Sequence, residues 1–446
     1  MKTILVTGSA GFIGSNLVLR LFKELSEGTI VGLDNLNDYY DPTLKDYRLS
    51  EIEKAKPAGI EYEFVKGDLA DKSLIDSLFE KYHFDVVVNL AAQAGVSYSI
   101  ENPDAYIQSN MIGFYNILEA CRHNPVEHLV YASSSSVYGG NKKVPFSTDD
   151  RVDNPVSLYA ATKKSNELFA HCYSKLYDIP TTGLRFFTVY GPAGRPDMAY
   201  FGFTNKLLKG ETIQIFNYGN CRRDFTYVDD IVEGVYRVMK GAPECKKGED
   251  GLPIPPYAVY NIGGGQPENL LDFVNILQEE LVRAGVLPAD FDFEAHKQLV
   301  PMQPGDVPTT YADAISKPRI FGLRFCPYLC AVFQILSRMT YMTIEQFRQI
   351  HEDWKQSGLS VQQYCENTGL TESRFYYWKS KLKAESLPSA CGSFIPVKMS
   401  GKSTVYSARN TSGKALCEIE YPNGVVVRVT SDMTLDQLRQ MVTLLR

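Results

Sequence analysis

The sequence contains no long apolar run, and this bears on the class of protein. A membrane-spanning helix needs about 18 or more consecutive apolar residues, whereas the longest suspicious run, residues 328–336, is about half that length. The N-terminus also lacks the succession of basic, apolar and small residues that forms a secretory leader. We therefore expect a cytoplasmic protein that makes no use of a membrane.

The nine cysteines lack the spacing of a disulfide framework or a metal site. Cys326 and Cys330 lie four residues apart, but no histidine or further cysteine stands near them to complete a ligand set. Scattered cysteines are typical of reduced thiols in a cytoplasmic protein. The sequence therefore predicts no bound metal.

The net charge of −6 is unevenly distributed along the 446 residues. Residues 342–446 carry 13 Lys and Arg against 10 Asp and Glu, whereas residues 1–341 carry 33 against 42. Opposite signs in two parts of a chain suggest different partners. The length and the apolar fraction of 44% suit a globular protein of two or three domains.

A glycine-rich turn, Gly8 to Gly14, separates an apolar strand pattern, 4–6, from an amphipathic helix pattern, 15–25. A helix N-terminus offers unpaired N–H groups and a positive dipole end, and glycines let a diphosphate approach the backbone. A second apolar strand ends in Asp34, about 20 residues further on, whose carboxylate can accept from a ribose diol and would repel a 2′-phosphate. We predict a dinucleotide site that favours NAD over NADP, against the alternative of a simple tight turn.

Strand and helix patterns alternate through the first half of the chain, which predicts an α/β fold with a doubly wound parallel sheet. Ligands of such folds bind beyond the carboxyl ends of the strands. Gly8, Asp34, Asp68, Ala91 and Ser134 all fall at such ends. Asp68 is either an acceptor for an adenine amino group or only the cap of a turn.

Tyr159 and Lys163 stand four residues apart, on one face of a predicted helix. A tyrosine is a poor base at its ordinary pKa near 10, but a nearby ammonium and a positively charged nicotinamide favour the phenolate. Such a tyrosine can take a hydroxyl proton while hydride leaves the same carbon, and Ser134 can hydrogen-bond that hydroxyl. A Tyr-x-x-x-Lys pair on a surface helix is the alternative, which the preceding turn and strand ends disfavour.

Residues 1 to about 322 resemble the extended short-chain dehydrogenase/reductases, and among them the nucleotide-sugar epimerases of the UDP-glucuronate 4-epimerase branch. The segments that carry the resemblance are Asn35–Asp41, Ala91–Val96, Arg185–Pro192, Gly194–Met198, Arg223–Asp230 and Gln303–Val307. The resemblance implies a Rossmann domain with a smaller substrate lobe, contributed mainly by about 190–230 and 250–322.

Matched position by position, the resemblance implies three groups of site residues. The catalytic residues are Ser134, Tyr159 and Lys163. The NAD-binding residues are Gly8, Gly11, Phe12, Ile13, Gly14, Asp34, Asp68, Leu69, Ala91, Ala92, Tyr159 and Lys163. The residues that hold the nucleotide-sugar are Ser134, Ser136, Thr188, Arg195, Arg223 and Asp306. For Arg195 and Arg223, a structural ion pair is the alternative role.

The implied reaction oxidises the sugar at C4 with NAD⁺, turns the flat 4-keto sugar over and returns the hydride to its other face. Related 4,6-dehydratases read Thr-Asp-Glu where this chain has Ser134, Ser135 and Ser136, and related decarboxylases usually carry Glu at the last of these positions. Without those carboxylates epimerisation is favoured over elimination and decarboxylation. The branch generally has Arg where this chain has Ser97, which keeps UDP-glucose and UDP-galactose as alternative substrates to UDP-glucuronate.

The resemblance ends near Gly322, before a helical segment that closes the substrate lobe in the family, so the epimerase part is expected to be truncated. Residues 323–341 match nothing and read as a bridge. Capping and turn residues then predict three helices with a tight turn, 368–370, before the last, which is typical of a helix-turn-helix domain over 342–385. A linker, 386–414, precedes a predicted β-hairpin around Asn423-Gly424 and a final helix within 415–446.

On the third of these helices Arg374, Tyr377 and Lys381 share a face that could contact DNA, or could simply be the solvated face of a packing module. Three segments, Trp354–Ser360, Phe375–Lys379 and Tyr421–Val425, carry a second resemblance. Through them residues 342–446 resemble the small accessory protein that a family of bacterial insertion sequences encodes beside its transposase. The leading interpretation is an NAD-dependent UDP-sugar 4-epimerase that carries this domain, with a homodimer and contact with DNA or a transposase left open. The alternative is an inactive truncated epimerase whose working part is the C-terminal domain.

Overall fold

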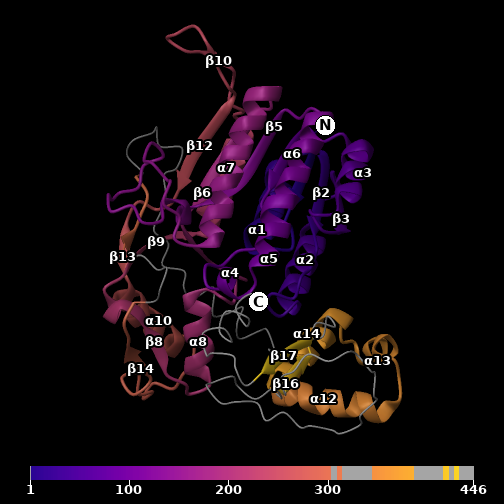
Figure 1. Ribbon diagram of the computed structural model, residues 1–446, viewed down its shortest axis with the longest axis vertical. Helices are drawn as coiled ribbons and strands as arrows, with labels where there is room; N and C mark the ends of the chain where they lie inside the picture. The colour runs from indigo at the N-terminus through magenta and orange to yellow at the C-terminus, as the bar shows by residue number, and fades with distance from the viewer. Residues whose placement is uncertain (1, 303–308, 314–343, 386–414, 421–425, 431–446) are drawn as a thin grey trace. The chain divides into compact units, whose positions relative to one another are not determined.

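The computed structural model describes residues 2–302, 309–313, 344–385, 415–420 and 426–430 (Figure 1). Contacts divide the chain into two units, Met1–Leu387 and Pro388–Arg446, and each is described by itself. Among the described residues no helix combines the length and the apolar character that a membrane span requires.

A seven-stranded sheet forms the centre of the larger unit (Figure 1). Its strands are β1 (Lys2–Thr7), β2 (Gly28–Asp34), β3 (Ile60–Lys66), β4 (Val86–Asn89), β5 (His128–Ser134), β6 (Thr181–Phe186) and β12 (Tyr257–Ile262), in the order β12-β6-β5-β4-β1-β2-β3. Every neighbouring pair is parallel. The predicted doubly wound parallel sheet is confirmed, and the strand order reverses beside β1, where ligands of this fold bind.

Helices cover both faces of this sheet. On one face lie α1 (Phe12–Glu24), α2 (Thr43–Ala55) and α9 (Val228–Met239); on the other lie α3 (Lys72–Tyr82), α6 (Gly113–His123) and α7 (Leu158–Tyr177). Apolar side chains spaced one turn apart bury one face of each helix, as Leu17 and Leu21 do on α1. With both faces covered, the central strands are largely apolar, and Val87 and Val88 of β4 are fully buried. The edge strand β3 has exposed Glu61 and Glu63 between its buried residues.

Residues 98–123 form an interrupted helical segment. After α4 (Tyr98–Glu101), the chain forms α5 (Pro103–Tyr106), a π-helical turn η1 (Ile107–Ile112) and then α6. The π-turn directs the buried side chain of Asn110 at the loop after β4, where it accepts from Gln93 N at 2.8 Å and donates to Gln93 O at 3.0 Å. The same amide donates to Thr162 Oγ1 of α7 at 3.1 Å. Such π-turns are frequent at functional sites.

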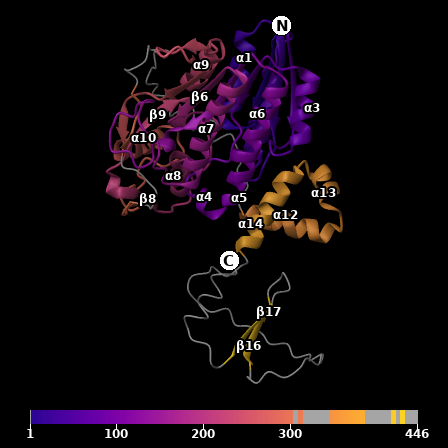
Figure 2. The same cartoon turned by 45° about the horizontal axis from the view of Figure 1, so that its top comes forward.

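A smaller lobe lies beside the seven-stranded sheet (Figures 1 and 2). It has its own apolar core. Its elements are β7 (Thr188–Tyr190), α8 (Ala199–Leu208), β8 (Ile213–Ile215), η3 (Phe216–Gly219), β9 (Arg222–Tyr227), β13 (Pro267–Asn269), α10 (Leu270–Arg283), β14 (Lys297–Leu299) and β15 (Thr309–Thr310). Residues 257–262, which fall within the range expected for this lobe, instead form β12 of the main sheet. The short strands β10 (Lys246–Lys247) and β11 (Pro253–Ile254) pair with each other, and η2 (Ser135–Tyr138) follows β5.

Residues 344–385 form the three predicted helices, α12 (Ile344–Ser357), α13 (Val361–Thr368) and α14 (Glu372–Glu385). Ser360 and Gln363 form a reciprocal capping box at the start of α13, and Gly369 ends that helix with a left-handed φ of 71°. Phe347 and Phe375 are fully buried in the small core between the helices. The three expected helices and the tight turn between the last two are therefore present.

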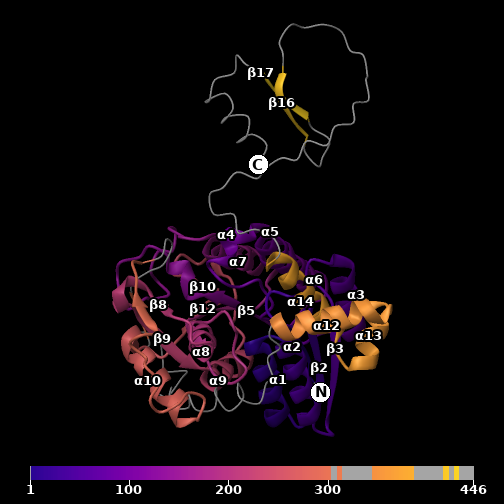
Figure 3. The ribbon, with the colours of Figure 1, turned by 90° about the horizontal axis from the view of Figure 1, so that it is seen from below.

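The C-terminal unit contains two described strands, β16 (Ala415–Glu420) and β17 (Val426–Thr430), which pair antiparallel as the predicted hairpin requires (Figure 3). The bridge, the linker, the Asn423-Gly424 turn and the final predicted helix lie outside the described residues.

A buried ion pair fastens α7 to the sheet. Glu167, 3% exposed, accepts from Arg185 Nε at 2.7 Å, from Arg185 Nη2 at 2.8 Å and from Ser133 Oγ at 2.8 Å. Burial alone would raise the pKa of Glu167, but the hydrogen bonds and charge of Arg185 outweigh it and hold that pKa below its ordinary 4.5. Because Ser133 precedes Ser134 and Glu167 follows Lys163 by one turn, the pair fixes the serine strand against the helix of Tyr159.

We expect Glu167→Gln to destabilise the protein by about 3–5 kcal/mol at neutral pH, because Arg185 would remain buried without its counter-charge. The folded-state pKa is lowered, so the stabilisation is present above the unfolded value of 4.5 and is lost as pH falls through the folded value. The difference in unfolding free energy between the two proteins should therefore shrink in acid. Urea denaturation followed by circular dichroism at several pH values measures it.

The matched control is Glu51→Gln, on the exposed pair that Glu51 makes with Lys54. It should change stability by no more than about 0.5 kcal/mol. Equal stability of wild type and Glu167→Gln at neutral pH would contradict the role assigned to the buried pair.

Candidate functional site

The backbone of the glycine turn after β1 lies in close contact with other backbone atoms. A Cβ atom on Gly8 would lie 2.8 Å from Ala91 N, and one on Gly14 would lie 2.1 Å from Gly8 O. Gly8 also adopts a left-handed φ of 69°, and its N–H donates to Leu33 O at 2.7 Å. No other residue type fits these positions without displacing the loop, so the turn leaves the N-terminus of α1 open to a ligand.

Asp34 lies at the carboxyl end of β2, directly beside this turn. Its Oδ2 accepts from Ala10 N at 3.2 Å and its Oδ1 from Leu36 N at 2.9 Å. Lys45 Nζ, from α2, lies 3.8 Å from Asp34 Oδ1. Carboxylate oxygens accept more than one hydrogen bond each, so Asp34 retains capacity to accept from a ribose diol.

Asp68, at the end of β3, has partners within the fold. Its Oδ1 accepts from Ala70 N at 2.9 Å and its Oδ2 from Asn35 Nδ2 at 2.8 Å. Asp68 therefore does cap a turn, and it also lines the cavity described below. The two roles that the sequence left open are compatible.

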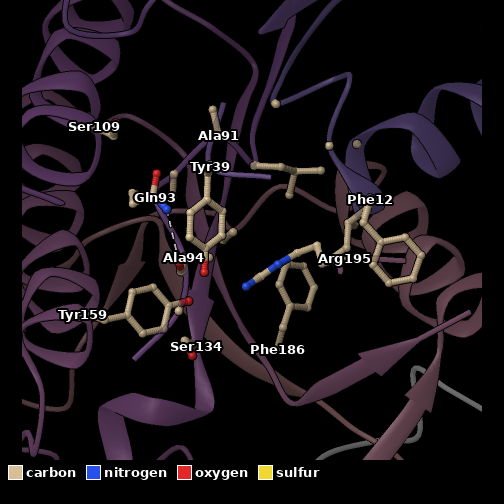
Figure 4. Close-up of a pocket in the computed structure, with 18 of the residues that line it drawn as sticks. Phe12, Tyr39, Ala91, Gln93, Ala94, Ser109, Ser134, Tyr159, Phe186 and Arg195 are labelled. Atoms are coloured by element: carbon tan, nitrogen blue, oxygen red, sulfur yellow. Dashed lines mark hydrogen bonds between the residues drawn. The ribbon is translucent and has the colours of Figure 1, made fainter. Parts of the chain in front are cut away.

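Tyr159 enters the site from α7, and Ser134 enters it from the end of β5 (Figure 4). Lys163, also on α7, lines the same cavity. Lys163 Nζ donates to Ala132 O at 2.8 Å, and Ser136 Oγ donates to Ser134 Oγ at 2.8 Å. The Tyr159 ring meets that of Tyr106 edge to face, with centroids 6.0 Å apart. The three residues predicted to be catalytic are thus brought together across 29 residues of sequence.

Burial moves the pKa values of Tyr159 and Lys163 in opposite directions, in each case away from the charged form. Burial raises the pKa of Tyr159 above 10.0, and its hydrogen bond with Ser134 and the charge of Arg195 offset this only in part. Burial lowers the pKa of Lys163 from 10.5 to about 8. A phenolate at neutral pH therefore needs further positive charge in the cavity.

Arg195 extends into the cavity from the smaller lobe (Figure 4). Its Nε donates to Asp197 Oδ1 at 3.0 Å and its Nη2 pairs with Asp197 Oδ2. Tyr39 OH, from the loop after β2, donates to the same carboxylate at 3.1 Å. Arg195 thus has the ion pair that was its alternative role while it also borders the space where a ligand would lie.

These residues surround one cavity of about 430 Å³. The predicted site residues that line it are Gly8, Gly11, Phe12, Ile13, Gly14, Asp34, Asp68, Leu69, Ala91, Ala92, Ser134, Ser136, Tyr159, Lys163, Thr188 and Arg195. Arg223 does not line it: β9 leaves this side chain partly exposed, with Nη1 donating to Arg222 O at 3.1 Å. Asp306 lies outside the described residues.

Sequence reasoning missed several residues of the site. The sequence patterns did not identify helix α2, and Lys45 and Arg48 were missed with it, because both are charged residues at buried positions of a helix with no apolar stripe. Asn110 was missed because nothing in the sequence marks a π-turn. Gln93 and Tyr39 line the cavity within segments that carried the family resemblance, which was the available signal.

On α14, the three residues proposed to contact DNA follow one helix face. Lys381 is exposed, and its Nζ lies 5.7 Å from the centre of the Tyr377 ring. Arg374 and Tyr377 are partly buried. In the described part of the chain, no group of three His, Cys, Asp or Glu could hold a metal ion.

The cavity fits a dinucleotide. The space around Gly8 and Gly14 would be lost to any Cβ, the helix N-terminus faces it, and an acidic side chain stands at the adjacent strand end. When NAD is bound, Gly11 to Gly14 would hold its diphosphate and Asp34 its ribose, with Lys163 and Tyr159 at the opposite end of the lining.

Replacing Gly14 by alanine should weaken NAD binding by about tenfold or more, equal to about 1.4 kcal/mol, because the new methyl group would collide with Gly8 O. Gly202→Ala is the control, since a Cβ there meets nothing within 4 Å. Calorimetric titration of each full-length variant with NAD gives the affinities. Wild-type affinity for NAD in a folded Gly14→Ala protein would contradict the role of the glycine turn in binding NAD.

Relatives match more than two thirds of this chain. The chain is 51% identical over 316 residues to Protein CapI of Staphylococcus aureus, covering 70% of this chain and 90% of that one. It is 47% identical over 329 residues to UDP-glucuronate 4-epimerase 4 of Arabidopsis thaliana, covering 72% and 71%. The structure is similar to that of UDP-glucuronic acid 4-epimerase from Bacillus cereus in complex with UDP-glucuronic acid and NAD, with a TM-score of 0.63, 30% identity, and coverage of 75% and 99%.

The model of the NAD dependent epimerase/dehydratase family matches residues 4–263, more than half of the chain. That range contains all the elements that form the cavity, from the glycine turn to Arg195. NAD is accordingly the cofactor of this enzyme, and the chain belongs to the NAD dependent epimerase/dehydratase family.

Proposed function

We propose that this protein interconverts the C4 epimers of a UDP-sugar, and specifically UDP-glucuronate and UDP-galacturonate. One observation carries the proposal: Tyr159, Lys163 and Ser134 line the same cavity as the glycine turn and Arg195. The names of relatives at 43–47% identity support the same reaction and substrate.

In the proposed reaction Tyr159 takes the proton of the 4-hydroxyl and later returns one. Bound NAD supplies a hydride acceptor that gives the hydride back, so the reaction has no net redox change. Ser134 orients the reacting oxygen, and Lys163 contributes positive charge near the phenol. That charge, with that of the oxidised nicotinamide, would offset the burial that raises the pKa of Tyr159.

The distribution of carboxylates favours epimerisation over elimination. Asp34 and Asp68 are the acidic residues among those that line the described cavity, and both stand at the end where the adenosine would lie. Beside Tyr159 the lining offers the hydroxyls of Ser134, Ser135 and Ser136 instead. Removal of water from a neighbouring carbon would need an acid and a base there.

The choice of UDP-glucuronate rests on the relatives and on the polar lining near Tyr159. Ser97, which replaces the arginine usual in the branch, is exposed and does not belong to the described lining. The serine supplies no cation for a sugar carboxylate, so the choice of UDP-glucuronate is carried by the relatives. Ser136 and Thr188 offer hydroxyl donors that suit a sugar carboxylate.

The test is turnover by the purified full-length protein. UDP-glucuronate should be converted into a mixture with UDP-galacturonate, and Tyr159→Phe should lower kcat by about 10²–10⁴-fold because the proton acceptor is lost. Binding of NAD to this variant should remain within about twofold of wild type. Chromatography of the nucleotide-sugars and calorimetry measure the two quantities.

Tyr115→Phe, at a half-exposed position of α6, is the control and should leave turnover unchanged. If wild-type protein that binds NAD turns over no UDP-hexose, the proposed function is wrong. Turnover of UDP-glucose in preference to UDP-glucuronate would overturn only the substrate.

A second proposal concerns residues 342–446, which we take to be an accessory module derived from an insertion sequence. It is supported by the capping box, the three-residue turn and the basic face of α14, a combination suited to phosphate contact. The inactive truncated enzyme remains the alternative to an active fusion. The homodimer also stays a prediction.

If α14 contacts DNA, the full-length protein should retard a duplex in a mobility-shift experiment, more strongly at low salt. Arg374→Ala should weaken the shift, whereas Lys355→Ala, in an exposed pair with Glu352 on α12, should not. Unchanged mobility of the duplex at low salt would count against this proposal and leave the epimerase proposal untouched.

A further inference from the structure

Arg48 connects three segments that border the cavity, although it is not part of the lining. It projects from α2 and is 2% exposed. Its Nη1 donates to Ala10 O in the glycine turn at 3.0 Å and to Tyr40 OH at 2.7 Å. Its Nε donates to Ala193 O at 3.0 Å, and its Nη2 donates to Ala193 O at 2.6 Å and to Gly194 O at 3.2 Å.

These partners are all neutral. Among the described residues no carboxylate lies within ion-pair distance of Arg48, whereas the other deeply buried arginine of the main domain, Arg185, is paired with Glu167. A buried cation without a counter-charge is costly. Backbone carbonyl oxygens accept hydrogen bonds from all three nitrogens of the guanidinium. The bonds to Ala10 and Ala193 therefore constrain both loops strongly.

The loop that Arg48 holds carries a backbone strain. Ala193 adopts a left-handed φ of 52°, which is unfavourable for a residue with a side chain. Two residues later comes Arg195, which extends into the cavity. The bonds from Arg48 to the carbonyls of Ala193 and Gly194 stabilise this conformation. They thereby fix the position of the backbone from which the Arg195 side chain extends.

We propose that Arg48 is a positioning residue that couples the two ligands: it makes binding of a UDP group at the Arg195 loop strengthen binding of NAD at the glycine turn. The coupling rests on the proposed function for the identity of the UDP ligand. A ligand held by Arg195 restricts residues 193–195, and this ordering reaches Ala10 through a single rigid guanidinium. The second ligand then finds its loop already ordered and loses less conformational entropy on binding.

Such coupling is reciprocal, since each ligand must change the affinity of the other by the same factor. For an enzyme that reoxidises its cofactor within each turnover, it would keep NAD in place while the sugar is a ketone. Arg48 touches neither ligand in this arrangement, so its loss should reduce the coupling more than the affinity for either ligand alone.

The experiment is a thermodynamic cycle on the full-length protein, with NAD and UDP titrated calorimetrically, each alone and with the other at saturation. Wild type should show at least about a fivefold mutual increase in affinity. In Arg48→Met both ligands should still bind, and the mutual factor should fall to within about twofold of unity. Lys54→Met, at an exposed position of the same helix, should keep the wild-type factor.

A second variant guards against loss of folding. Arg48→Lys keeps the charge, but an ammonium cannot span Ala10 and Ala193 together, so its factor should also approach unity. A folded Arg48 variant that keeps the wild-type factor overturns the inference, as does a wild-type factor of one. If wild type binds NAD but no UDP, both this inference and the proposed function fall; absence of turnover with intact coupling defeats the proposed function alone.

Discussion

The site depends on the contact between the glycine turn and the end of β4. Gly8 approaches the backbone of Ala91 so closely that a Cβ atom would lie 2.8 Å from its nitrogen. This contact is possible because β1 pairs with both β2 and β4, placing Thr7 opposite Leu33 on one side and Asn89 on the other. Residues that follow these strands consequently meet at one edge of the sheet, where the chain has left room for a ligand instead of side chains.

Burial acts differently on the charged groups around this edge. Glu167 and Arg185 compensate each other, and their pair holds the serine strand against α7. Tyr159 and Lys163 have no such mutual compensation, and burial favours the neutral form of both. The protein alone therefore holds Tyr159 in place without making it a base. Under the proposed mechanism the phenol loses its proton only in the presence of the positive charge of the oxidised cofactor. The phenol would therefore not act before the cofactor is bound.

The sequence predicted what depends on local pattern. Continuous apolar runs identified the buried parallel strands, the glycine spacing identified the turn, and the Tyr159–Lys163 spacing placed both residues on α7. It could not predict α2, because Lys45 and Arg48 are charged residues at buried positions. Arg48 is held there by loops distant in sequence, through Ala10 O and Ala193 O. The hydrogen bond between Tyr39 and Asp197 likewise joins residues that only the fold brings together. Arg223 was predicted at the ligand from family resemblance, but the described cavity does not include it.

The arrangement around Arg195 bears on how one site can hold a substrate and still let its sugar turn over. Asp197 already occupies the Nε–Nη2 edge of the Arg195 guanidinium, and Tyr39 donates a hydrogen bond to that carboxylate. An anion that binds Arg195 must share the guanidinium with Asp197. This sharing lowers the affinity for a single sugar carboxylate more than the affinity for a diphosphate, which has several charged oxygens. Binding strength would then reside in the diphosphate, the part of the proposed substrate that does not change. The hydroxyls of Ser134, Ser136 and Thr188 make weaker, interchangeable contacts, and such contacts allow a ketone sugar to present either face to the cofactor.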